Sequence, residues 1–167
     1  MPLDRQWIEQ HIPHKGRMCL LDEVLAWDAA HIRCRSGSHR SDVNPLRAHG
    51  RLGAACGIEY AAQAMAVHGA LIAASAPLAS TVATSVRGSI GAGVGYLASV
   101  RNVTLAVAQL DELSADLIAD AERITGDGRT VLYDFTVSCE RQPLLAGRAS
   151  IVFGTAMPLA PGAGGDA

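Results

Sequence analysis

A single acidic residue lies in a long uncharged stretch of this sequence. Between Arg51 and Arg87 the only formally charged side chain is Glu59, in the Ala-rich segment GRLGAACGIEYAAQAMAVHGALIAAS. A carboxylate in apolar surroundings costs stability unless it has a partner or a chemical task. Because burial disfavours the charged form, we expect a raised pKa for Glu59 and a carboxyl that donates a proton. The competing interpretation is a structural ion pair with Arg51 or Arg101 across a subunit interface.

Two further side chains could complete a site for proton transfer. Gln63 follows Glu59 by four residues, so both side chains lie on one face of a helix. We expect Gln63 to hold the carboxyl or to bond the facing strand, and we place it among the residues that line the substrate site. His49 lies ten residues before Glu59, in the turn-like segment NPLRAHGRL. Because histidine titrates near neutral pH, we predict that His49 is the base. His39 is the reserve candidate, and His68, within the apolar stretch, is expected to be structural.

The composition is that of a globular protein with one domain. Of the 167 residues, 49% are hydrophobic and 18% charged, and the net charge of -2 gives no general attraction to nucleic acid or to anionic membranes. The four cysteines lack the spacing of a metal site, so we expect no metal, and no other cofactor is implied. The first residues are too polar for a signal peptide, which predicts a cytoplasmic protein.

The elements that must position Glu59 follow from hydrophobic periodicity and from turn residues. In chain order we predict a short helix over 4–11, strands over 18–27 and 30–38, a long helix over 52–75, and strands over 96–108, 113–125, 130–140 and 143–153. GDGRT and ERQP are the predicted turns between the last three strands. Ala and Gly supply most of the apolar residues in the long helix, which favours a buried helix over a membrane span.

One antiparallel sheet wrapped around a long central helix accounts for this order of elements. This α+β arrangement is the hot-dog fold. A helix without a charged face must be covered on both sides, so we expect the sheet on one side and a second chain on the other. We predict a single domain over 1–156, with a Gly-rich loop after the helix, and a disordered tail over 157–167.

Two segments resemble the 3-hydroxyacyl-ACP dehydratases, which have the hot-dog fold. IPHKGRMCLLDEV is similar to their Pro-His-(Arg/Lys) opening and first strand, and its His14 is expected to be structural. LGAACGIEYAAQAM is similar to their central-helix signature, in which a Glu and a Gln are four residues apart, like Glu59 and Gln63. GYLASVRNV resembles a segment of the divergent ApeP-like subgroup from aryl-polyene clusters. The resemblance covers residues 12–153.

The resemblance implies a reaction and a partner. The reaction is dehydration of 3-hydroxyacyl-ACP thioesters to 2-enoyl-ACP, in fatty-acid or polyene biosynthesis. The partner is an acyl carrier protein that bears the acyl chain on phosphopantetheine, with Arg47 or Arg51 as candidate contacts to the acidic carrier. The protein is expected to form a homodimer, or a heterodimer with another hot-dog protein.

The sequence departs from the family at the start of the helix and at the histidine. Gly53-Ala54 replaces the family's Pro-Gly, and the family's Gly-His-Phe loop, fourteen residues before the Glu, is absent. A deletion of four residues would give His49 the place of the family's base. We expect the backbone N–H groups of Gly53, Ala54 and Ala55 to bind the substrate by its thioester carbonyl.

Two other functions remain open. A hot-dog thioesterase also uses a helix carboxylate, often with a nearby Gln, and it would hydrolyse acyl-CoA or acyl-ACP without His49. A non-catalytic subunit would complete or stabilise an active hot-dog dehydratase. The missing Gly-His-Phe loop favours this second alternative, in which a histidine of the partner chain would be the base.

Overall fold

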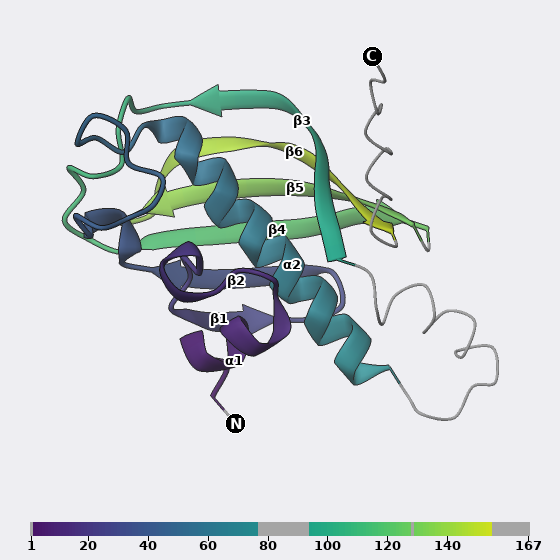
Figure 1. The fold of residues 1–167 in the computed structure, drawn as a ribbon. Coiled ribbons are helices and arrows are strands. Elements are labelled where there is room, and N and C mark those ends of the chain that lie inside the picture. The colour runs from purple at the N-terminus through teal and green to yellow at the C-terminus, as the bar shows by residue number, and fades with distance from the viewer. Residues whose placement is uncertain (1, 77–93, 128, 155–167) are drawn as a thin grey trace, which may run out of the picture.

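The structure, a computed structural model, describes residues 2–76, 94–127 and 129–154. Figure 1 shows one curved sheet that wraps around a long helix, α2 (Gly57–Ser75), with a short helix, α1 (Arg5–His11), beside the first strands. All strand pairs are antiparallel. The strands, in their order across the sheet, are β1 (Glu23–Trp27), β2 (His31–Ser36), β4 (Leu117–Gly126), β5 (Thr130–Cys139), β6 (Gln142–Gly154) and β3 (Val94–Leu105). This is the predicted hot-dog fold.

The predicted Gly-rich loop and tail lie outside the described residues, apart from the loop's last positions, which belong to β3.

Helix α2 begins later than the sequence predicts. The segment before it pairs as an extended strand: the N–H of Leu110 donates to Leu52 O at 2.8 Å, and the N–H of Ala54 donates to Ala108 O at 3.0 Å. A 3₁₀ turn over Ala54–Cys56 then leads into the α-helix. Within the described residues, no helix combines the length and apolarity needed to cross a lipid bilayer.

Close packing against the sheet explains the small residues on α2. A Cβ atom added to Gly57 would overlap the side chain of Leu145 on β6, so a larger residue here would require Leu145 to move. The buried positions of α2 include Tyr60, Ala61, Ala64 and Met65, all of which belong to the main hydrophobic core. The first turn of α2 is therefore fixed against the concave face of the sheet.

The six strands occur in the predicted order, and two of them begin several residues later than predicted. The first predicted strand began at residue 18, whereas Met18 ends a 3₁₀ turn and β1 begins at Glu23; β4 begins at Leu117 instead of residue 113. The turn between β5 and β6 comprises Glu140 and Arg141, with φ of 49° and 69°, which is the geometry of a two-residue hairpin.

The two edges of the sheet differ. At β1, the N–H of Val24 donates to Leu3 O at 2.8 Å, and Asp4 forms a bridge with Glu23, so the N-terminal segment covers this edge. At the other edge lies β3, which pairs with β6 on its inner side. No strand among the described residues pairs with the outer side of β3.

Two histidines are fully buried. His68 on α2 donates from Nε2 to Asp28 O at 2.8 Å, so its Nδ1 accepts from the Tyr133 hydroxyl at 3.0 Å. His39 donates from Nε2 to Leu113 O at 3.0 Å. Burial lowers the pKa of both imidazoles, although hydrogen bonds to backbone carbonyls oppose the shift. Both histidines therefore belong to the folded state in their neutral form.

The free energy of unfolding should fall as the pH drops from about 7 to about 5, while carboxyl groups stay ionised. Because His39 and His68 have lowered pKa values in the folded protein, the unfolded chain binds protons more readily. Each histidine contributes a slope of at most about 1.4 kcal/mol per pH unit, and the stability is complete above the unfolded pKa. Urea unfolding at several pH values measures this slope. His68→Gln should reduce it, and His49→Asn, at an exposed histidine, should leave it unchanged; equal slopes for all three proteins would contradict the assignment.

Candidate active site

Glu59 lies on the first turn of α2, as the sequence predicts, and its side chain is 31% exposed. An acidic residue is stabilised at this end of a helix because the helix dipole is positive there. Its Oε1 atom lies 3.0 Å from Nε2 of His14 and accepts a hydrogen bond of 3.0 Å from Nε2 of Gln63. The carboxyl group is thus partly buried but open to solvent on one side.

Gln63 joins the helix to the segment that precedes β1. Its Nε2 also donates to Met18 O at 2.8 Å, and its Oε1 accepts from the N–H of Leu20 at 2.8 Å. The side chain is completely buried, and its amide uses both of its hydrogens. Gln63 therefore bonds both Glu59 and the segment before β1, and its predicted part in substrate binding stays a prediction.

The pKa of Glu59 lies below its ordinary value, so the expected raised pKa is wrong. Burial does act to raise it, but hydrogen bonds from His14 and Gln63, followed by the charge that His14 can carry, outweigh burial. Each of these interactions stabilises the carboxylate form. At neutral pH Glu59 is therefore ionised, and it is suited to accept a proton rather than to donate one.

His14 is the neighbour of Glu59 that sequence reasoning missed. The two residues are 45 positions apart, and the opening motif indicated only a structural role. The short segment between α1 and the 3₁₀ turn Gly16–Met18 brings the imidazole to the carboxylate. Gln63 helps to fix this segment through its hydrogen bond to Met18 O. The spacing of Glu59 and Gln63 was therefore the one sequence signal that bears on the position of His14.

The three predicted backbone donors differ in availability. The N–H of Ala54 is bonded to Ala108, whereas Gly53 and Ala55 are exposed and no hydrogen bond is described for their N–H groups. A Cβ atom on Gly53 would have no neighbour within 4 Å, so the space beside it is open. Gly53 and Ala55 can therefore donate to a ligand next to the start of α2.

The other predicted residues lie apart from this cluster. His49 is exposed at the tip of a tight turn, with φ of 52°, and no contact with Glu59 is described. His39 is fully buried. Arg47 donates to three backbone carbonyls, and Arg51 pairs with Asp111 and Glu112 rather than with Glu59. The predicted roles of His49 as base and of these arginines in carrier binding stay predictions.

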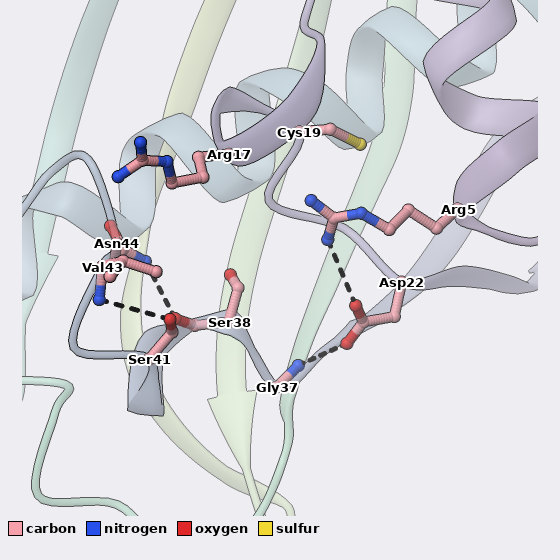
Figure 2. Close-up of a pocket in the computed structure, with 9 residues that line it drawn as sticks. All are labelled: Arg5, Arg17, Cys19, Asp22, Gly37, Ser38, Ser41, Val43 and Asn44. Atoms are coloured by element: carbon pink, nitrogen blue, oxygen red, sulfur yellow. Dashed lines mark hydrogen bonds and ion pairs between the residues drawn. The ribbon is translucent and has the colours of Figure 1, made fainter.

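A pocket of ≈ 350 Å³ lies between the N-terminal segment and the loop after β2 (Figure 2). Next to it, the buried amide of Asn44 donates to Tyr60 Oη at 2.9 Å. Ser36 donates to Leu20 O, so Ser38 must donate to Ser36, and Tyr60 must donate to Ser38. Each hydroxyl in this series of hydrogen bonds therefore donates in one direction only. The series fixes the hydroxyl of Tyr60, the residue that follows Glu59 on α2. The pocket is lined by Arg5, Arg17, Cys19, Asp22, Gly37, Ser38, Ser41, Val43 and Asn44.

Within the described ranges, no three His, Cys, Asp or Glu side chains converge as they would around a metal ion. A carboxylate next to an imidazole is suited to proton transfer, with the exposed residues Gly53 and Ala55 shortly before it in the chain.

Comparison with known proteins agrees with this architecture. One chain of the dehydratase heterocomplex ApeI:P from Xenorhabdus doucetiae is 20% identical, with 93% of each chain covered and a TM-score of 0.69. A thioesterase from Staphylococcus aureus (12% identity, coverage 80% and 93%) and one from Haemophilus influenzae (11% identity, coverage 81% and 80%) each superpose with a TM-score of 0.52. At these identities the likeness concerns the fold alone.

Comparison with a family model assigns the chain to a family, which the structural likeness alone does not. A search of curated proteins gave no significant match. The model of the ApeP-like family, described as ApeP dehydratase, matches residues 6–157, which is most of the sequence. The chain therefore belongs to the ApeP-like dehydratase family.

Proposed function

We propose that the protein is a cytoplasmic 3-hydroxyacyl-ACP dehydratase in fatty-acid or polyene biosynthesis, and that Glu59 is its catalytic carboxylate. The observation that carries this proposal is a partly exposed carboxylate, held by His14 and Gln63 on the first turn of α2, shortly after the exposed residues Gly53 and Ala55. Its lowered pKa favours the ionised form. Elimination of water from a 3-hydroxyacyl thioester needs a base for the C2 proton and stabilisation of charge on the carbonyl. The start of α2 can supply both.

The reaction can be written with these groups in place. The Glu59 carboxylate takes the C2 proton, and the electron pair of that C–H bond forms the C2=C3 double bond as the C3–O bond breaks. The leaving hydroxyl takes a proton from a protonated imidazole, which becomes neutral, and departs as water. Negative charge that develops on the thioester oxygen is stabilised by the N–H groups of Gly53 and Ala55. The lowered pKa of Glu59 thus reverses the acid and base roles that the sequence suggested.

Glu59→Gln should abolish most of the dehydration without unfolding the protein. The amide keeps the shape and can still accept from His14 and Gln63, but it cannot take a proton. We expect turnover to fall by about 10²-fold or more, with a melting temperature close to that of the wild type. Mass spectrometry of 3-hydroxyacyl-ACP measures the loss of one water. A variant that keeps its turnover but melts several degrees lower would assign Glu59 a structural role.

His49→Asn tests the source of the proton for the leaving hydroxyl. Asparagine tolerates the left-handed backbone at this position, so the turn should stay intact. If His49 donates the proton, turnover should fall by about 10²-fold or more while the melting temperature stays constant. Unchanged turnover would contradict this assignment. Turnover that requires a second hot-dog chain would instead assign the imidazole to that chain.

Thioester hydrolysis is the second candidate function. An ionised carboxylate next to an amide is also suited to activate water, which is the observation that favours it. Acyl-ACP that lacks a 3-hydroxyl separates the two reactions. Release of free thiol from this substrate, dependent on Glu59, would identify a thioesterase, whereas a dehydratase leaves it unchanged.

The outer edge of β3 is the proposed surface for a second hot-dog chain. Tyr96 and Leu105 on this strand are each 51% exposed, and Leu97 and Val103 are also exposed. An edge strand with exposed apolar side chains is prone to pair with another chain. The ApeI:P relative is a heterocomplex, which supports assembly with a related hot-dog partner, and a second copy of this chain is the alternative.

The purified protein should be a dimer or larger at micromolar concentration by light scattering. Tyr96→Lys with Leu105→Lys should yield monomers, because two charges on the β3 edge oppose pairing. Ile124→Lys is the matched control, since Ile124 on β4 is 45% exposed but lies away from this edge. A monomeric wild-type protein, or a double variant with unchanged mass in solution, would contradict the proposed interface.

A further inference from the structure

The two oxygens of Glu59 are in different environments. Oε1 receives the amide hydrogen of Gln63 and lies 3.0 Å from Nε2 of His14, whereas no hydrogen bond is described for Oε2. Two donors on one oxygen stabilise the charge there and leave the other oxygen as the accessible acceptor. The carboxylate is therefore asymmetric before any substrate binds.

The other nitrogen of His14 determines which protons the ring can carry. Nδ1 is buried and has no hydrogen-bond partner in the described part of the chain. A doubly protonated ring would leave a charged N–H buried without an acceptor, which costs more than a buried lone pair. The fold therefore favours the neutral ring with its hydrogen on Nε2, where the Glu59 oxygen accepts it.

Charged side chains lie across from His14 and next to it in the chain: Glu59 faces the ring from α2, and Lys15 and Arg17 follow it. From α2, the facing side chains are Glu59 and the uncharged Gln63. On the segment of His14 itself, the Lys15 ammonium is bonded to the backbone carbonyls of Glu9 and Ile12. The hydrogen bond from His14 also stabilises the Glu59 carboxylate more than the charge of His14 does.

We propose that His14 is a positioning residue: as a neutral donor from Nε2, together with Gln63, it fixes Oε1 of Glu59 and leaves Oε2 to take the proton of the substrate. The role of Oε2 rests on the proposed function. The protonation state of His14 and its effect on the pKa of Glu59 are independent of that function, and both can be measured without any substrate.

Nuclear magnetic resonance tests the first part directly. Nitrogen-15 shifts of His14 should show a hydrogen on Nε2 and none on Nδ1 at neutral pH. The carbon-13 titration of Glu59, identified by its absence in Glu59→Gln, should move to higher pH in His14→Leu, which removes a donor. His14→Gln can donate from its amide and should restore most of the wild-type titration.

Kinetics test the second part. As the Glu59 pKa rises in His14→Leu, the acidic limb of kcat/KM against pH should move upward with it, and His14→Gln should move it back. His31→Leu is the matched control, because Nε2 of His31 lies 3.1 Å from the Asp120 carboxylate, far along the sheet. This variant should change neither the Glu59 titration nor the pH profile.

Two results would overturn the proposal. One is a proton on Nδ1 of His14 at neutral pH, and the other is an unchanged Glu59 titration in a folded His14→Leu. If the wild-type protein turns over no hydroxyacyl-ACP while His14 and Glu59 titrate as expected, the proposed function fails and the role of His14 in holding the carboxylate stands.

Discussion

The hydrogen bonds of one buried amide connect the parts of this site. Gln63 bonds Met18 O, the N–H of Leu20 and Oε1 of Glu59. A buried amide of this kind is costly unless every atom has a partner, and here the partners come from the segment before β1 and from α2 itself. Gln63 thus bonds the segment that follows His14 and the carboxylate that His14 faces. Its amide therefore helps to fix the distance between these two side chains.

The sequence predicts much of the fold because its local signals agree with each other. Strand-length segments separated by turn residues predicted β5 and β6 nearly to the residue, and the uncharged Ala-rich stretch predicted a central helix. The errors occur where tertiary contacts override local pattern. Leu52 and Ala54 look helical, but their backbone groups pair with residues 108–110. Met18, the first residue of the predicted opening strand, instead ends a 3₁₀ turn, and its carbonyl accepts from Gln63.

The candidate site was predictable only in part. A lone carboxylate with an amide four residues later identifies Glu59 and Gln63, because the helix period fixes their relation. His14 lies near them only because the chain between α1 and β1 folds back on the helix. The spacing of residues along the sequence does not predict such a tertiary contact. The pKa of Glu59 shows the same limit. Apolar neighbours in sequence suggested a raised pKa, whereas the donors that lower it come partly from a distant segment.

The covered edge at β1 has a consequence for how the sheet can grow. Leu3 and Asp4 occupy the backbone groups beside Val24 and Glu23, so a foreign strand finds no free pairing partner at the start of β1. Among the described strands, β3 differs in that no strand pairs with its outer side. An edge that the chain itself covers is less open to pairing with another molecule than an uncovered one. The segment at Leu3 and Asp4 thus makes the two edges of the sheet unequal, which favours growth of the sheet in one direction over growth in both.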